Sequence, residues 1–109
     1  MNAAISEGLF VRSEYKMVKI DLDEIDYIES LEDYIKIHIA HAKPILTLMT
    51  MKAVIEKLPT DKFIRIHRSY IIPFSKIRSI VNKKVLLASS KELPISDTYV
   101  NALNEWMKK

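Results

Sequence analysis

Apolar and polar residues alternate over much of the chain, in short runs that turn-forming residues separate. The pattern is clearest in residues 34–41, where Ile35, Ile37 and Ile39 alternate with Lys, His and Ala. A period of two residues is typical of a strand with one buried face, because successive side chains point to opposite faces. Similar runs predict further strands at residues 9–14, 17–20, 25–29, 45–49, 63–69, 77–81, 85–88 and 93–95.

Two other segments have the three-to-four-residue spacing of an amphipathic helix. Residues 51–58 place four apolar side chains on one face, with Thr50 as a candidate cap and Pro59 as a terminator. A C-terminal helix is predicted after Ser96, its candidate cap. Its apolar stripe consists of Tyr99, Val100, Leu103, Trp106 and Met107. We expect this stripe to pack against a sheet.

Many short strands with only two short helices argue against a parallel α/β sheet, in which strands and long helices alternate. The pattern therefore predicts a mainly β fold with one short internal helix and one short C-terminal helix. At 109 residues the chain is long enough for one domain. Residues 1–8 are small and polar and end at Gly8, the single glycine, so we interpret them as a linker or tail and residues 9–109 as the domain.

The chain contains no cysteine. A disulfide framework and thiolate metal ligation are therefore excluded, and a reducing, cytoplasmic location is expected. No apolar run approaches the ~20 residues that a membrane helix needs. The N-terminus also lacks the basic start and long apolar stretch of a secretory signal, so no membrane partner is expected.

Charge is distributed unevenly, although the formal net charge is only +3. Residues 62–91 contain eight Lys or Arg and no acid, whereas residues 1–34 contain nine acids and three bases. Ordinary solvated Lys and Arg would explain the small net charge, but they explain the acid-free segment less well. The segment favours a polyanionic partner such as nucleic acid.

Catalytic signals are weak. The histidines His38, His41 and His67 are scattered, and no acid is placed beside them to complete a metal site. The sequence has no His-Glu-x-x-His helix, glycine-rich phosphate loop or Gly-x-Ser-x-Gly elbow. The acids of residues 21–33 do not fit a calcium loop, so a solvated acidic face is the better interpretation. We therefore expect no enzyme activity, no metal and no cofactor.

The stretch Ile-His-Arg-Ser at residues 66–69 is more informative. Arg68 and Ser69 stand at the end of a predicted strand, with Arg68 on the opposite side from His67. An arginine fork can grip a phosphate or the O6/N7 edge of guanine, and serine is a common phosphate donor. The alternative is an arginine whose stem merely covers apolar surface. Local sequence leaves both interpretations open.

FIRIHRSYII followed by KIRSI, and then ELPIS before a short helix, resembles the LytTR family of bacterial DNA-binding domains. IDYIES, a loop and DYIKIHI match the same family upstream, so the resemblance covers about residues 9–107. It implies an elongated, mostly antiparallel domain of about ten short strands in three small sheets. It also implies that loops, rather than a recognition helix, enter successive major grooves of duplex DNA.

The resemblance further implies a role in transcriptional regulation, as the output domain of a two-component response regulator. Such domains follow a receiver domain and bind promoter sites as pairs of direct repeats, so a dimer on DNA is expected. The chain has no receiver domain of its own. It is therefore either an excised output domain or a stand-alone one.

Carried over by position, the resemblance implies a DNA-contacting surface in three parts. The first is the loop that ends at Tyr34, the second is Arg68 with Ser69, and the third is the turn around Ser96 and Thr98. Cations expected near phosphates are Lys76, Lys83 and Lys84. His67 resembles a residue that orders this surface rather than one that reads bases.

Acids at this surface depart from the family pattern. Many members have arginine at the positions of Asp97 and Thr98, and Asp97 here would weaken the attraction for phosphate. Glu32 and Asp33 precede Tyr34 in the first loop. We expect Tyr34 to touch DNA while these acids point elsewhere, and Asp97 to serve the start of the C-terminal helix instead.

Two other classes of function remain open. A binder of single-stranded nucleic acid would need several exposed aromatic residues on one face for base stacking. The basic segment offers Phe63, Tyr70 and Phe74, of which the first two lie in apolar runs typical of a core. A protein-interaction or dimerisation module could instead pair the acidic half of one chain with the basic half of another.

Overall fold

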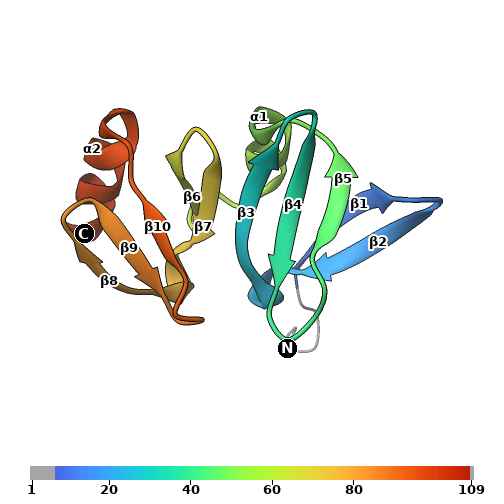
Figure 1. Ribbon diagram of the computed structural model, residues 1–109, viewed down its shortest axis with the longest axis horizontal. Coiled ribbons are helices and arrows are strands. Elements are labelled where there is room, and N and C mark those ends of the chain that lie inside the picture. Colours follow the sequence, from blue (N-terminus) through green and yellow to red (C-terminus); the bar gives the residue numbers. More distant parts are fainter. Residues whose placement is uncertain (1–6, 109) are drawn as a thin grey trace.

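The computed structural model describes residues 7–108. These residues form ten strands, two α-helices and two single-turn 3₁₀ helices (Figure 1). The elements are β1 (Gly8–Ser13), β2 (Lys16–Asp21), η1 (Leu22–Glu24), β3 (Ile25–Leu31), β4 (Tyr34–Ile39), β5 (Ile45–Leu48), α1 (Met51–Lys57), β6 (Phe63–His67), β7 (Tyr70–Pro73), η2 (Phe74–Lys76), β8 (Ile77–Val81), β9 (Lys84–Leu87), β10 (Glu92–Pro94) and α2 (Asp97–Met107). The predicted mainly β class is confirmed.

All strand pairs are antiparallel, and they form three sheets. The sheets contain β1-β2, then β5-β4-β3-β7-β6, then β10-β9-β8. They lie in a row across Figure 1, with the five-stranded sheet in the middle. The described part measures 41 × 41 × 25 Å, so it is extended in two directions and thin in the third.

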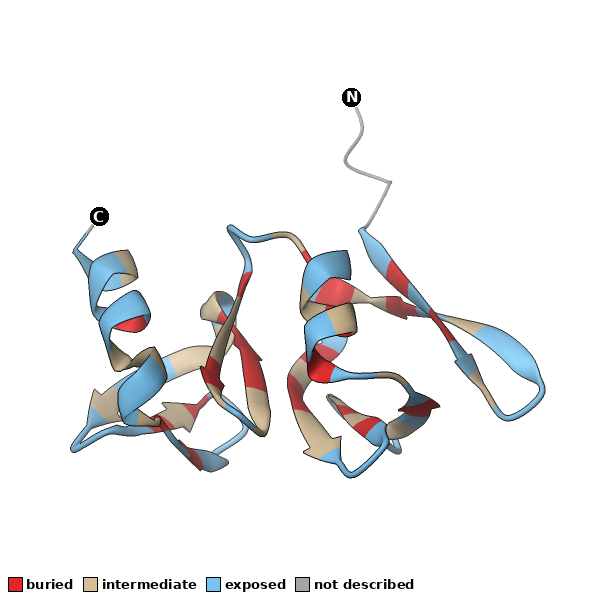
Figure 2. Ribbon diagram, turned by 90° about the horizontal axis from the view of Figure 1, so that it is seen from above, coloured by how far each residue is buried: buried red, intermediate tan, exposed pale blue. Residues whose placement is uncertain are grey.

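Two apolar cores lie on opposite sides of the five-stranded sheet, and buried residues therefore recur along all three sheets (Figure 2). The first core joins the β1-β2 hairpin and α1 to one face of the sheet and includes Ile28, Val54 and Ile71. The second joins the other face to the three-stranded sheet and α2, and it includes Ile72 and Leu103. Strands β3, β6 and β7 contribute residues to both cores, so the central sheet is their common wall.

Local sequence signals explain several element boundaries. The Thr50 hydroxyl oxygen accepts a hydrogen bond from the Ala53 N–H at 3.0 Å, as predicted for the cap of α1. The turn between β8 and β9 consists of Asn82 and Lys83, whose φ angles are 51° and 59°. Two left-handed residues give a hairpin turn whose twist matches the strands, and Asn tolerates this conformation well.

Four local expectations are corrected. The loop expected between the predicted strand at residues 25–29 and Tyr34 consists only of Glu32 and Asp33, because the residues on either side extend the β3–β4 ladder. The strand predicted at residues 63–69 ends at His67, and Tyr70–Pro73 forms β7, for which the pattern gave no element. Ser96 occupies the cap position of α2, but its side chain makes no capping hydrogen bond.

The fourth correction concerns the C-terminal stripe. Trp106 lies against Phe74 of η2, with ring centroids 3.9 Å apart and an interplanar angle of 8°. Leu103 is the buried member of the stripe, whereas Met107 remains 46% exposed. The stripe therefore packs partly on a sheet and partly on η2.

Strand β1 begins at Gly8, one residue before the start of the first predicted strand. Most of the tail predicted at residues 1–8 lies outside the described residues, which begin at Glu7. The Glu7 carbonyl accepts the Leu22 N–H at 3.0 Å, and the Glu7 carboxylate pairs with Lys62. The hydrogen bond between the Lys62 ammonium and the Glu7 carboxylate raises the pKa of Lys62. Neither α-helix of the described part is long and apolar enough to cross a membrane.

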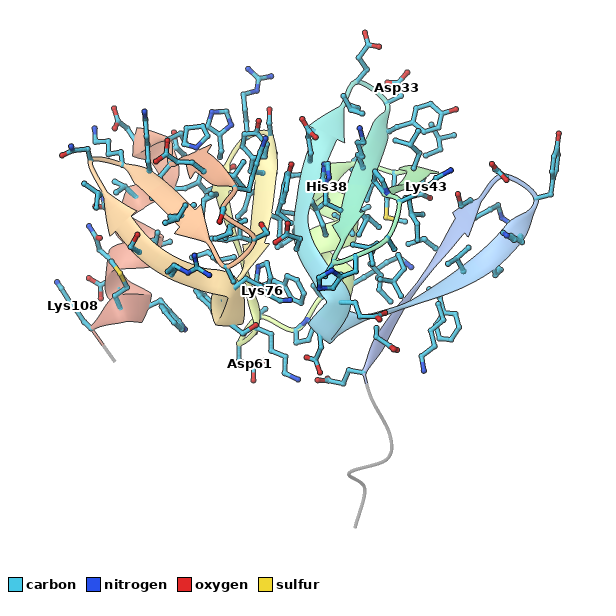
Figure 3. The ribbon with its side chains drawn as sticks, turned by 60° about the horizontal axis from the view of Figure 1, so that its bottom comes forward. Asp33, His38, Lys43, Asp61, Lys76 and Lys108 are labelled. Atoms are coloured by element: carbon cyan, nitrogen blue, oxygen red, sulfur yellow. The ribbon has the colours of Figure 1, made fainter. Side chains whose placement is uncertain are left out.

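The ends of the strands define two edges. The β3–β4 turn, the β6–β7 turn and the starts of α1 and α2 lie along the upper margin of Figure 1, and we call this margin the turn edge. The 3₁₀ helices η1 and η2 lie along the lower margin, which we call the opposite edge. Figure 3 shows the same separation, with Asp33 at one end and Asp61 and Lys76 at the other.

Candidate nucleic-acid interface

The β6–β7 turn presents Arg68 on a backbone that is fixed from within. The Ser69 N–H donates to Nδ1 of His67 at 3.1 Å, so the imidazole closes the turn. The Arg65 guanidinium donates to the carbonyl of His67 at 3.2 Å and to the carbonyl of Arg68. The Arg68 side chain is exposed, and none of the hydrogen bonds or ion pairs found in residues 7–108 engages it. It is therefore available to a ligand.

Backbone hydrogen bonds tie this turn to its neighbours. The Ser30 N–H donates to the carbonyl of Ser69 at 2.9 Å and so links the β3–β4 hairpin to the β6–β7 turn. On the other side, the Ser96 N–H donates to the carbonyl of Ile66, also at 2.9 Å. The three parts of the predicted DNA surface are thus brought together along the turn edge.

Arg65 adds a connection to α2. Its guanidinium carbon lies 5.6 Å from the centre of the Tyr99 ring, within the range of a cation–π interaction. Arg65 belongs to the acid-free basic segment, but the sequence pattern predicted no role for it. Strand alternation was the available signal, because it puts Arg65 on the same side of β6 as His67.

The β3–β4 turn carries both aromatic and acidic groups. Tyr34 begins β4 and is 48% exposed, opposite Leu31 on β3 and Leu48 on β5. Glu32 and Asp33 are exposed, and Glu32 has a left-handed φ of 54°. Tyr34 therefore sits at the turn edge with an apolar surround, while the acids occupy the tip.

The predicted lysines of the β8–β9 turn lie beside the start of α2. The Lys83 carbonyl accepts the Ile95 N–H at 2.8 Å, and the Lys83 ammonium pairs with Asp97. Lys84 lies 4.0 Å from a carboxylate oxygen of Glu92. Both pairs are exposed, and pairs of this kind contribute only about 0–1 kcal/mol, so phosphates can replace the acids at small cost. Thr98 is exposed in the first turn of α2.

Lys76 lies at the opposite edge. It ends η2, and its carbonyl accepts the Ala88 N–H at 2.8 Å. The surface cleft that it lines also contains Asp26 and His41, which lie at the far ends of β3 and β4 from their shared turn. The structure therefore brings seven of the eight predicted contact residues to the turn edge or its flank and separates Lys76 from them.

A polar groove of about 580 Å³ runs between the β3–β4 turn, the start of α1 and the β6–β7 turn. Its lining includes Ser30, Glu32, Thr50, Lys52, Arg68 and Ser69. Arg65 also lines it, so three cationic side chains meet one carboxylate there. Hydroxyl and cationic groups in this combination suit the oxygens of a phosphate chain.

A histidine–carboxylate pair lies outside this edge, between β3 and β4. His38 contacts a carboxylate oxygen of Glu29 at 2.9 Å and stacks on Tyr27 with ring centroids 4.0 Å apart. Burial, reinforced by the charges of Glu29 and Asp26, raises the pKa of Tyr27 to about 12. Within residues 7–108 no three His, Cys, Asp or Glu side chains are grouped so that they could hold a metal ion.

Comparison with solved structures finds the same fold in another protein. A solved structure described as the LytTr DNA-binding domain of a putative methyl-accepting/DNA response regulator from Bacillus cereus has the same fold, with a TM-score of 0.78. The match covers 96% of this chain and 99% of the other, at 17% sequence identity. No curated protein sequence matches the chain.

The sequence comparison defines the family. The family model of the LytTr DNA-binding domain matches residues 15–108, which is most of the chain. The chain therefore belongs to the LytTr DNA-binding domain family. The predicted resemblance, the ten strands in three sheets and the two short helices are all confirmed.

Proposed function

We propose that this domain binds duplex DNA sequence-specifically and regulates transcription as the output domain of a response regulator. The observation that carries the proposal is the turn edge itself. Three turns are tied by the Ser30–Ser69 and Ser96–Ile66 backbone hydrogen bonds, and Arg68 projects from the middle one with its side chain unengaged. A rigid edge with a planar donor fork suits readout of a groove, since the fork can bond guanine O6 and N7 together.

The proposed contact surface comprises Tyr34, Arg68, Ser69, Ser96 and Thr98, with Lys83 and Lys84 on the phosphates. The turns would enter successive major grooves on one face of the duplex. Pairs of direct repeats would then hold two copies, with a receiver domain attached in the full-length protein. This role requires binding alone and no catalytic step, and it implies a cytoplasmic setting, where bacterial DNA lies.

Burial of aromatic residues speaks against single-stranded nucleic acid as the ligand. Phe63 is 4% exposed and belongs to the first core, while Phe74 is covered by Trp106. Tyr70 packs on the second core. The basic segment therefore offers no row of exposed rings on which successive bases could stack.

Selection of binding sites from a random duplex pool tests the proposal directly. We expect an enriched site, bound at least 10³-fold more tightly than random duplex, as is usual for specific DNA binders. With about four or five phosphates neutralised, log K should fall against log salt with a slope near −4. A pool that yields no enriched sequence, or equal affinity for single strands, would contradict the proposal.

A further inference from the structure

The polar groove at the turn edge has two cationic walls. Lys52, in the first turn of α1, lines one side, and Arg68 on the β6–β7 turn lines the other. Arg65 also faces the groove, but its guanidinium is already occupied by the carbonyls of His67 and Arg68. Lys52 is exposed, and no ion pair found among the described residues engages it. Lys52 and Arg68 are therefore the cations that a ligand in the groove can recruit.

Hydroxyl groups supply neutral donors between these walls. Ser30 and Ser69 line the groove from the two turns, and Thr50 lines it from the cap of α1. The Thr50 oxygen accepts the Ala53 N–H, and this leaves its hydroxyl proton free to donate outward. Serine and threonine hydroxyls together with Lys and Arg are the usual donors to phosphate oxygens in protein–DNA contacts.

We infer that this groove takes the sugar-phosphate backbone of duplex DNA, and that Lys52 is the phosphate contact contributed by α1. The inference rests on the proposed function and adds a fourth contact element to the three turns. A lysine suits this task because its ammonium is a flexible point charge, whereas the arginine fork on the opposite wall suits planar recognition. The base-reading and backbone-holding roles are thus divided between the two walls.

Glu32 is the one acidic side chain lining the groove. It stands at the tip of the β3–β4 turn and is exposed, so it can turn outward into water. With two available cations facing one exposed carboxylate, the groove still attracts a polyanion. Glu32 lowers this attraction but does not cancel it.

Helix α1 offers a matched control, because Lys57 ends the same helix and is also exposed. It lies five residues further on, about 7.5 Å along the axis and on a different face. It does not line the groove. Lys52→Ala and Lys57→Ala therefore remove the same charge from the same helix, but only the first removes it from the groove.

The test uses fluorescence anisotropy with a labelled 30-base-pair duplex of random sequence, titrated at several salt concentrations. The random duplex isolates the backbone contribution and needs no knowledge of the operator. We expect Lys52→Ala to make the salt slope shallower by about one unit and to weaken binding roughly 5- to 10-fold near 0.1 M salt. Lys57→Ala should leave the slope unchanged, and both variants should melt like the parent because both sites are exposed.

Two outcomes would overturn the inference. Equal changes in Lys52→Ala and Lys57→Ala would mean that Lys52 acts only through net charge. A loss confined to the selected site, with random duplex unaffected, would make Lys52 a base reader instead. Failure of the proposed function looks different, because site selection with the parent protein would then yield no enriched sequence, whereas this inference is decided by the salt slopes of the two variants on random duplex. Only a parent protein without salt-dependent affinity for duplex would overturn both.

Discussion

The turn edge and the opposite edge are built from the two ends of the same strands, yet their chemistry differs. The turn edge is polar, and its turns are tied by backbone hydrogen bonds around an unengaged Arg68. The opposite edge holds a groove of about 350 Å³ with a mainly apolar lining that includes Leu22, Phe63 and the stacked pair Phe74 and Trp106. The groove at the turn edge is thus lined mainly by polar and cationic side chains, whereas the groove at the opposite edge is mainly apolar.

A count of charges along the sequence overstates the positive charge that the turn edge presents. The acid-free segment at residues 62–91 is divided between the edges. Lys62 and Lys76 go to the opposite edge, where Lys62 is neutralised by Glu7 and its pKa is raised by that hydrogen bond. Lys83 and Lys84 meet acids as well. The charge available for DNA is therefore smaller than the segment suggests, and its placement matters more than its sum.

Trp106→Ala should disrupt packing at the opposite edge without changing the turn edge. Of the substitutions considered, it should have the largest effect, and the effect is on the free energy of unfolding. Removal of a half-buried ring that stacks on Phe74 should lower the free energy of unfolding by about 2–3 kcal/mol. Met107→Ala is the matched control, and it should change stability by less than about 0.5 kcal/mol because the Met107 side chain is exposed. Urea denaturation measures both. DNA affinity below the melting transition should be unchanged, and a specific loss of affinity would contradict the separation of the edges.

Arg68→Ala should impair DNA recognition at the turn edge without changing the packing of the opposite edge. If the fork reads guanine, the variant loses about 1–3 kcal/mol of discrimination between the selected site and random duplex. Stability should be unchanged, because the side chain is exposed. Competition binding with both duplexes measures the difference. An equal loss on both duplexes would make Arg68 a phosphate contact and shift base readout to Tyr34 or Thr98.

Arg65→Ala tests whether the turn must be fixed for Arg68 to read DNA. We expect a loss of about 1 kcal/mol in the preference for the selected site, with the salt slope unchanged because no phosphate contact is removed. In the Arg68→Ala background the same substitution should cost nothing further, as a double-mutant cycle will show. Arg78→Ala is the control, since its guanidinium bonds the Ala88 carbonyl at 2.8 Å in the other sheet. Additive losses would indicate that Arg65 acts independently.

The smallest expected effects are those of the lysine substitutions on DNA affinity. They test where the DNA-contacting surface ends, because the lysines lie at different edges. Replacing Lys83 and Lys84 together by Ala should weaken specific and random duplex equally, a few-fold, with a salt slope shallower by about one to two units. Lys76→Ala should leave the slope unchanged, because Lys76 lies at the opposite edge. A shallower slope for Lys76→Ala would extend the DNA surface around the molecule.

Alternation predicted most strands because most of them bury one face. It failed at β7, where Ile71 and Ile72 are both buried but in different cores, so that the run is continuously apolar. The C-terminal helix was predicted, but the covering of Phe74 by Trp106 was not. That contact joins two residues that are 32 positions apart, and it leaves no periodic trace in the sequence.

The candidate surface was predictable only in part. The motif around Arg68 and Ser69 indicated the central turn, and the resemblance indicated the turns on either side. Arg65 fixes the central turn by donating to the carbonyls of His67, at 3.2 Å, and Arg68. These contacts depend on the path of the turn in space, which sequence spacing alone does not predict. The position of Lys76 at the opposite edge could not be predicted either. It depends on η2, a 3₁₀ turn that redirects the chain and for which the sequence pattern gave no signal.

The central sheet couples the halves of the domain during unfolding. Neighbouring residues on one strand serve different cores, as Tyr27 and Ile28 do on β3. Neither core can therefore be exposed without peeling away a strand that the other core requires, and the domain should unfold in a single cooperative transition. Amide hydrogens of β3 and β7 should then exchange with solvent only through global opening, and so more slowly than those of the β1-β2 hairpin.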